Sequence, residues 1–455
     1  MKSRDKYILL FLPVLFFVFF SFYDGVVWCV DSPSYVNMTV DREPVYPLFL
    51  LFFRTLFSGN ETYLQTAVLV QGLLMAFAIF SLVWFLRKEF KLNIYKTLLI
   101  EILFLLVSLL CRFAAKRGSM YSNSLLSESL AYPLFILFFR FVFEYLLTGT
   151  KKPLIISTVL SVILISTRKQ MYLSLALIVI CVFYQTVKQK DYRKILNLIL
   201  IILVVIGSNK ALDYTYNSLI RGLHNSHTSS DRFMATVVFF CSEKDNAELI
   251  KDNETKQIFI KVYEACESKG LLKNRNAVGW YENAMDFCDN YDIIQLHNMW
   301  PMEREYAEKL YDVSDDEIEV IVDRYNKTIV GSLLPEIWPT VLSTFFCNVL
   351  LGIMTTVAAV NRVFMLYSFV IVALYILLMV INIYFNHLDN YSLFGLLVFV
   401  SCAINICVVS MVIFPQTRYT IYNMALFYTA GFLMLCDMVN YIRNKKGAEY
   451  GFKNK

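Results

Sequence analysis

Long apolar runs constrain this chain more than any other feature of its sequence. Runs of spanning length occur at about 7–23, 64–86, 94–111, 130–147, 153–167, 170–187, 194–209, 338–360, 363–385, 391–413 and 420–441. Because a segment in lipid must satisfy its own backbone hydrogen bonds, each run predicts a transmembrane helix of about 20 residues. The 455 residues are 57% hydrophobic and 17% charged, whereas soluble domains carry about 25% charged residues. The sequence therefore predicts an all-α polytopic membrane protein.

Short basic connectors predict the orientation of these helices. They lie at 87–96, 150–152 and 188–194 and in the tail at 443–446. The positive-inside rule places all of them, together with the N-terminus, in the cytoplasm. The first run resembles a signal peptide, but no small-residue cleavage site follows it, so we expect it to stay as the first span. We therefore expect a multi-pass protein of the cell membrane with a cytoplasmic N-terminus.

The number of spans stays open at about 10 to 12. Eleven spans that start inside would leave the basic tail outside, against the positive-inside rule. Either one run is not a full span, or residues 363–414 hold an extra short helix.

The same orientation leaves three segments outside, at 24–62, 112–129 and 212–337. The last of them combines charged residues with helical periodicity, as in AELIKDNETKQIFIKVYEACESKG. We expect residues 1–211 to form an N-terminal transmembrane module with a functional first outer loop at 24–62. Residues 212–337 predict a mainly helical extracytoplasmic domain, and residues 338–455 the C-terminal transmembrane helices with a short cytoplasmic tail.

The first outer loop places acids and a cation at the membrane surface. Asp31 opens the stretch DSPSY, and Arg42 opens the stretch REPVYP. The prolines in both stretches stiffen the backbone and disfavour regular helix. Residues 48–57 are apolar but too short to span, which predicts a helix lying along the outer leaflet. The alternative is a solvated loop whose charges only mark topology.

Further cations fall on the same predicted face of the membrane. They are Arg112, Lys116 and Arg117, with Glu128 at the next helix entry; Arg168 and Lys169 in the turn STRKQMY; and Arg418, followed by Tyr419, at the start of the last span. Cations at a membrane surface suit lipid-linked phosphates. The alternatives for the three groups are headgroup anchoring, an ordinary hairpin turn and an interfacial Arg-Tyr belt.

Other polar residues receive no functional role from the sequence. His224 and His227 have a spacing that metal ligands use, but a third and a fourth ligand are not evident, so we expect a hydrogen-bonded loop. Glu101 and Glu144 lie within apolar runs, where a carboxylate is costly, although it also pairs within a bundle or reaches the interface. Most of the ten cysteines lie in apolar runs and count as small hydrophobes.

A first span followed by DSPSY and REPVYP resembles the Asp-bearing first outer loop of the GT-C membrane glycosyltransferases. The closest resemblance is to bacterial multi-pass enzymes that are distantly similar to protein O-mannosyltransferases and aminoarabinose transferases. LLSESLAYPLF (125–135) is similar to the entry of their fourth span, and Arg418-Tyr419 to the Arg-Tyr before a late span. The resemblance covers most of the first 190 residues and, in architecture, the final third. It implies a GT-C-like helical bundle.

The resemblance also implies roles for individual residues. In that family an acid of the first outer loop acts as general base or positions the acceptor, and cations hold the phosphate of the donor. Asp31 becomes the catalytic acid group, and the implied substrate-binding residues are Arg42, Tyr46, Lys116, Arg117, Glu128, Arg168, Arg418 and Tyr419. The sequence departs from the Asp-Glu pair of several relatives because Ser32 follows Asp31, which leaves Asp24, Asp41 and Glu43 as rivals.

The expected function is transfer of a sugar from a polyprenyl-phosphate donor to an extracytoplasmic glycan, lipid or protein, in polysaccharide biosynthesis at the cell envelope. This reaction needs a carboxylate to deprotonate or orient a hydroxyl, and fixed positive charge for the departing phosphate. The expected partners are the donor, the acceptor and the lipid bilayer, with no nucleic acid. The sequence requires no cofactor and leaves a divalent cation open. The alternatives are a transporter or flippase of lipid-linked sugars, whose paired halves are not visible here, and a glycan polymerase or ligase.

Overall fold

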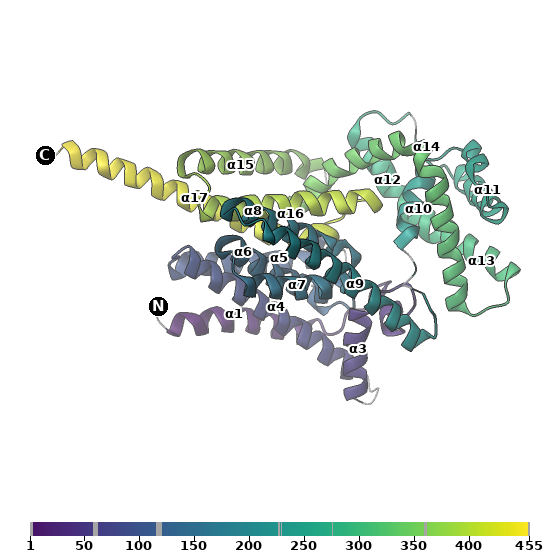
Figure 1. Cartoon of the computed structure of the whole chain (residues 1–455), viewed down its shortest axis with the longest axis horizontal. Coiled ribbons are helices and arrows are strands. Elements are labelled where there is room, and N and C mark those ends of the chain that lie inside the picture. The colour runs from purple at the N-terminus through teal and green to yellow at the C-terminus, as the bar shows by residue number, and fades with distance from the viewer. Residues whose placement is uncertain are drawn as a thin grey trace.

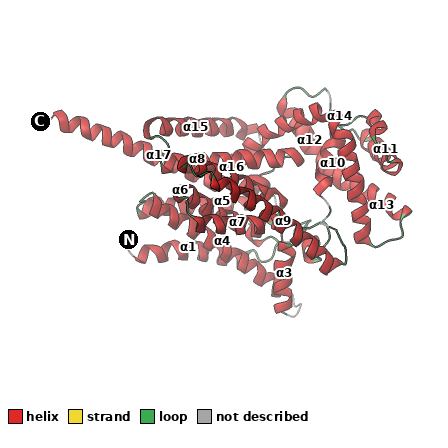
Figure 2. Ribbon diagram, viewed as in Figure 1, coloured by secondary structure: helices red, strands yellow, loops and turns green. Residues whose placement is uncertain are grey.

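The computed structural model describes residues 3–57, 62–114, 121–225, 228, 230–274, 276–358 and 362–453. In these ranges the chain is helical and contains no strand, only an isolated bridge between Val27 and Ser124 (Figure 2). By length and composition, nine helices of the described chain are suited to cross a membrane. The prediction of a helical polytopic membrane protein is therefore confirmed.

The N-terminal half of the chain supplies most of a bundle of side-by-side helices (Figure 1). Its helices are α1 (Ser3–Tyr23), α2 (Ser32–Val36), α3 (Val45–Leu56), α4 (Thr62–Glu89), α5 (Ile94–Ala114), α6 (Glu128–Thr148), α7 (Lys151–Thr167), α8 (Tyr172–Gln189) and α9 (Arg193–Arg221). Short 3-10 turns, η1 (Tyr121–Asn123) and η2 (Lys169–Met171), precede α6 and α8. Helix α3 is set across the direction of α1 and α4 (Figure 1).

The C-terminal half completes the bundle and adds helices beyond one end of it (Figure 1). Its elements are α10 (Ser230–Cys241), η3 (Lys244–Leu249), α11 (Asn253–Ser268), α12 (Trp280–Ile294), the π-helical turn η4 (Gln295–Met299), α13 (Trp300–Leu310), α14 (Asp315–Val357), α15 (Arg362–Asn386), α16 (Asn390–Val412) and α17 (Thr417–Lys453). We call α10 to α13 and the first half of α14 the inserted helices. They surround a hydrophobic cluster that includes Phe239, Ile258, Tyr291 and Ile329 and that continues into the segment between α16 and α17 at Phe414.

The two ends of the bundle differ in what they carry. Both termini lie at one end, which we call the terminal end, and the inserted helices project from the other (Figure 1). Helix α14 finishes at this second end, because the first turn of α17 contacts its last residues. The Thr420 hydroxyl donates to the carbonyl of Thr355 at 2.7 Å, and the Thr417 hydroxyl to that of Ala358 at 3.4 Å. The described part of the apolar run, up to residue 358, thus does not reach the terminal end, which favours the alternative that this run is not a full span.

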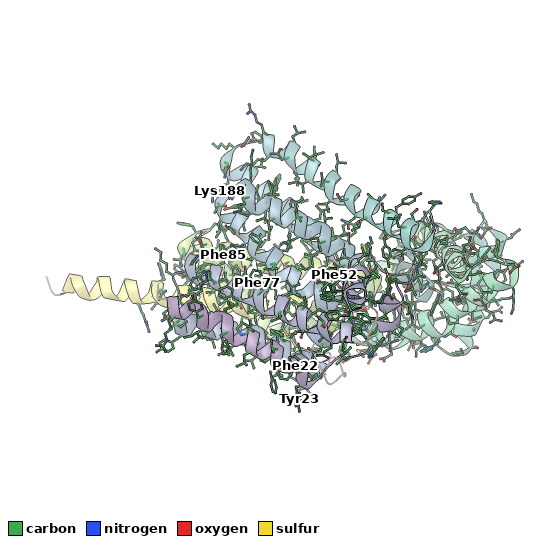
Figure 3. All side chains as sticks on the ribbon, turned by 90° about the horizontal axis from the view of Figure 1, so that it is seen from below. Phe22, Tyr23, Phe52, Phe77, Phe85 and Lys188 are labelled. Carbon is green, nitrogen blue, oxygen red and sulfur yellow. The ribbon has the colours of Figure 1, made fainter. Side chains whose placement is uncertain are left out.

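Helix α6 forms the centre of the bundle. It is the most buried of the nine candidate spans, with 78% of its window inside the protein, and the side chains of Phe135, Phe138 and Phe139 are fully buried. A helix that is apolar on every side belongs in the interior of a bundle. Helices α9 and α15 lie at the surface and are mostly exposed. Other apolar side chains project from the bundle as well, among them Phe22, Phe52 and Phe77 (Figure 3). The first residue of α6, Glu128, therefore lies at the centre of one bundle end.

Candidate functional site

Five charged side chains form a continuous series of ion pairs at the end of the bundle opposite the termini. Asp31 Oδ1 lies 3.2 Å from Arg42 Nη2, and Asp31 Oδ2 lies 3.0 Å from Arg418 Nη2. Glu128 Oε1 lies 2.5 Å from Arg418 Nε, and Glu128 Oε2 lies 2.9 Å from Arg168 Nη1. These residues come from the first loop, the start of α6, the α7–α8 turn and the start of α17. We call the five the charge chain.

The short helix α2 fixes Asp31 relative to Arg42. Pro33 is its second residue, where the fixed φ of proline suits a helix start. The Ser34 hydroxyl donates to the carbonyl of Asp31 at 2.7 Å and accepts from Arg42 Nε at 2.7 Å. Ser34 thereby connects Asp31, the first residue of DSPSY, with Arg42, the first residue of REPVYP.

Two tyrosines pack behind the charge chain. The guanidinium carbon of Arg42 lies 4.7 Å from the centre of the Tyr35 ring, and the Tyr35 hydroxyl is hydrogen-bonded to Ser127 Oγ at 2.9 Å. Burial raises the pKa of Tyr35 to about 12, so the hydroxyl stays protonated at neutral pH. The ring of Tyr46 is fully buried against that of Tyr35, and its hydroxyl donates to Gln71 at 3.1 Å. Tyr46 lies behind the charge chain, and its contact with a substrate stays a prediction.

The α7–α8 turn is fastened to the start of α17. Arg168 adopts an extended backbone between α7 and η2 and donates from Nε to Gln170 Oε1 at 3.0 Å. Gln170 Nε2 in turn donates to the carbonyl of Tyr419 at 2.6 Å and to Asn405 Oδ1 at 2.7 Å. The Tyr419 ring lies near both arginines, 5.0 Å from the guanidinium carbon of Arg168 and 5.3 Å from that of Arg418.

Exposure and charge vary along the charge chain. The side chain of Asp31 is 27% exposed, whereas that of Glu128 is 1% exposed. Within the charge chain three guanidinium groups face two carboxylates, and Arg42 is also paired with Asp41. Burial alone would raise the pKa of Asp31, but Arg42 and Arg418 outweigh it and hold this pKa below its ordinary value. Asp31 is therefore a carboxylate at neutral pH, on the accessible side of the chain.

Two of the rival acids, Asp41 and Glu43, and the predicted Lys169 lie at the edge of the site. Asp41 Oδ2 is 3.3 Å from Arg42 Nε, and Glu43 Oε1 accepts a hydrogen bond from the backbone of Lys169 at 3.1 Å. Lys169 Nζ lies 3.6 Å from Asp213 Oδ2 on α9. Asp24 follows α1, and its backbone NH donates to the carbonyl of Phe20 at 3.0 Å.

Some predicted residues lie outside the described part of the chain. Lys116, Arg117 and His227 are among them, and only the backbone of Arg112 is described. His224 Nδ1 lies 3.0 Å from the Ser218 hydroxyl. In the described ranges, no three His, Cys, Asp or Glu residues are grouped so as to hold a metal ion.

Sequence reasoning missed the neutral members of the site. Tyr35, Ser127, Gln170 and Asn405 connect the charged residues, as described above. Their signal in the sequence is weak, because single polar residues beside apolar runs are common. Asn405 is an exception, since an amide within the apolar run 391–413 needs a partner.

Comparisons with known proteins identify no family for this chain. No protein-family model, no curated protein and no solved structure matches it.

Proposed function

We propose that the protein is a membrane glycosyltransferase that moves a sugar from a polyprenyl-phosphate donor to an acceptor outside the cell membrane. The charge chain is the observation that carries this proposal. Three arginines and two acids from four distant segments meet at one end of an apolar bundle. The side chains of the three arginines, Arg42, Arg168 and Arg418, are partly buried, with 21%, 15% and 18% of their surface exposed. Their guanidinium groups are ion-paired with Asp31 and Glu128 rather than fully solvated.

The arginines supply what a departing phosphate needs. A guanidinium binds phosphate oxygens with two parallel hydrogen bonds, and its charge is permanent. Arg418 already places separate nitrogens on Asp31 and Glu128. A phosphate that replaced one of these carboxylates would meet the Arg418 N–H donors already in position. The protein would then need little rearrangement as negative charge develops on the departing phosphate.

The surroundings of the charge chain suit a lipid donor. Helix α3 buries Tyr46, Leu50 and Phe53, whereas its Phe52 and Leu56 are exposed. An apolar face of this kind beside a bundle end fits the boundary between headgroups and acyl chains. The basic connectors at 87–96 and 188–194 follow α4 and α8 at the terminal end. By the positive-inside rule, the charge chain then faces the extracytoplasmic side.

The first test substitutes Asp31. In a strain that lacks the protein, complementation with Asp31→Asn is expected to leave the surface glycan unchanged from that of the deletion strain, because the acceptor hydroxyl loses its orienting carboxylate. Composition and intact mass of the surface glycan are the measurements. Asp312→Asn, an exposed acid between α13 and α14, is the control and is expected to restore the wild-type glycan.

The same experiment separates the proposal from its alternatives. Full transfer by Asp31→Asn would contradict the role given to this residue. A deletion strain that lacks the glycan and accumulates the lipid-linked sugar on its cytoplasmic face, rather than on its outer face, would instead indicate a flippase. A deletion strain with glycans of altered length only would indicate a polymerase or ligase.

A further inference from the structure

A turn in the first outer loop, made of residues 36–40, has all of its backbone carbonyls hydrogen-bonded. We call it the 36–40 turn. Carbonyls at and beyond the last turn of a helix, here α2, need donors from elsewhere. The donors, with the carbonyl that each one reaches, are Arg54 Nη1 for Val36 (3.4 Å), Arg221 Nη2 for Asn37 (2.5 Å) and for Met38, the Arg42 backbone NH for Thr39 (3.2 Å) and the Thr228 backbone NH for Val40 (3.1 Å). The turn is therefore held by segments that lie far apart in the sequence.

Met38 has an unusual backbone conformation within this turn. Its φ is 56°, in the left-handed region, and its side chain is only 5% exposed. A residue with a side chain is disfavoured in that region and stays there only where the surrounding contacts hold it. Arg221 donates to the Met38 carbonyl, and Arg54 Nη2 donates to Met38 Sδ at 3.6 Å. Two arginines thus hold the turn in a conformation that its sequence does not favour.

The 36–40 turn leads directly into the charge chain. The Thr39 hydroxyl donates to the carbonyl of Ser34 at 3.1 Å and to Asp41 Oδ1. Asp41 Oδ2 is paired with Arg42, whose backbone NH is bonded to the Thr39 carbonyl. The position of the Arg42 guanidinium group therefore depends on the conformation of the turn.

Arg221 joins this turn to the inserted helices. It is the last residue of α9, which ends at Gly222 with a left-handed φ of 70°. Its Nη2 reaches the turn, and its Nη1 lies 3.3 Å from Asp316 Oδ2 in the first turn of α14. A cation at the end of a helix also interacts favourably with the helix dipole, but that role requires neither contact.

We infer that Arg221 is a positioning residue of the transfer reaction, which holds the 36–40 turn so that Arg42 meets the phosphate of the donor. This inference rests on the proposed function. Without Arg221, two carbonyls of the turn lose their donor, and the backbone relaxes to an ordinary conformation shortly before Arg42. A misplacement of about 1 Å near a reacting group lowers a rate by about 10²-fold. Because Asp316 contacts the other side of Arg221, the placement of Arg42 also depends on the inserted helices.

The experiment is a double-mutant cycle on Arg42 and Arg221 in the full-length protein. The measurement is the dissociation constant of undecaprenyl phosphate for the protein purified in detergent. Arg42→Gln removes a charged donor and is expected to weaken binding by about tenfold or more. Arg221→Gln displaces Arg42 and is expected to weaken binding by about threefold to tenfold. The double variant is expected to bind as weakly as Arg42→Gln alone, because no Arg42 remains to be positioned.

The cycle separates positioning from a purely structural role. A residue that only stabilised the fold would lower the thermal midpoint, and its effect on binding would multiply with that of Arg42→Gln. Such multiplication, or wild-type binding by Arg221→Gln, would overturn the inference. Arg418→Gln reports on the proposed function, since it should also bind about tenfold or more weakly. Wild-type binding by Arg418→Gln would overturn the proposed function itself.

A matched pair of variants on α14 tests the link to the inserted helices. Asp316→Asn removes the ion pair with Arg221 but keeps the arginine and its carbonyl contacts, so it decides the matter even if Arg221→Gln does not fold. It is expected to weaken binding of undecaprenyl phosphate by about twofold or more, and to have no further effect in the Arg42→Gln background. Asp315→Asn is the control, because Asp315 lies in the same helical turn and is paired with Arg304 at 2.7 Å. Asp315→Asn should bind as the wild type does, and equal binding by the two variants would overturn the link.

Discussion

Arg418 connects two acids that lie almost 100 residues apart in the sequence, Asp31 and Glu128. Its Nε and Nη2 point to different carboxylates, which a lysine ammonium cannot reproduce with the same geometry. Because Glu128 is 1% exposed, its charge depends on Arg418 and Arg168 for compensation. At the scale of single residues, the site is therefore held together by arginine forks.

The ion pairs of Asp31 predict how stability depends on pH. The pKa of Asp31 in the folded protein is lowered by Arg42 and Arg418, so its contribution is fully present above the unfolded pKa of about 3.9. The contribution is lost as the pH falls through the folded pKa. We expect the difference in thermal midpoint between wild type and Asp31→Asn, measured in detergent, to be largest near pH 7 and to shrink below about pH 4. A difference that is constant over this range would contradict the ion-pair assignment.

At the scale of single helices, one polar residue interrupts an apolar helix without belonging to the charge chain. Helix α5 carries Glu101 in its middle, with a fully buried side chain. Neither carboxyl oxygen has a hydrogen-bond partner among the described residues. A buried carboxyl without a partner costs folding free energy and carries out no visible task in the charge chain.

This cost predicts the effect of a substitution in α5. Glu101→Leu removes the unpartnered polar atoms and keeps a side chain of similar size, so we expect it to raise the thermal midpoint of the purified protein and to leave glycan formation unchanged. Asn348→Asp serves as the opposite control, since it would introduce a carboxyl at a buried position of α14 and is expected to lower the midpoint. A lower midpoint for Glu101→Leu would show that the carboxyl has a partner that stabilises it.

Helices α3 and α14 show the limits of reading elements from hydropathy. The apolar stretch 48–57 predicts a short helix, and the structure forms α3 at Val45–Leu56. The longer run 338–360 predicts a span by the same criterion, yet it belongs to the 43-residue α14, which begins among the inserted helices. Pro335 and Pro339 lie inside α14. Hydropathy records that a face is buried in apolar surroundings, but it does not distinguish lipid from packing against α15, α16 and α17.

For the whole molecule, the path of α14 predicts the topology. If the apolar run of α14 does not cross the membrane, both termini lie on one side, as the positive-inside rule requires. A C-terminal fluorescent-protein fusion is then expected to fluoresce and a C-terminal alkaline-phosphatase fusion to be inactive. Phosphatase inserted at residues 269–279, between α11 and α12, should be active. An active C-terminal phosphatase would show that the run 338–360 crosses the membrane.

The sequence by itself determined the class of this protein and the candidates for its site. Apolar runs of spanning length leave a helical bundle as the only way to satisfy the backbone in lipid. Charges beside such runs are costly enough to stand out, which is why Asp31, Arg42, Glu128, Arg168 and Arg418 were identifiable before any contact was known. The orientation of the bundle follows from its basic connectors as a prediction.

Only the tertiary structure decided which of these charges meet. Arg418 lies 387 positions after Asp31, and no local pattern records a contact over such a distance, because it depends on how α6, α7 and α17 pack around one bundle end. The neutral residues that hold the arginines, such as Ser34 and Gln170, have ordinary sequence contexts. The hydrophobic pattern of the sequence determines where helices form, whereas the packing of those helices determines which distant side chains come into contact.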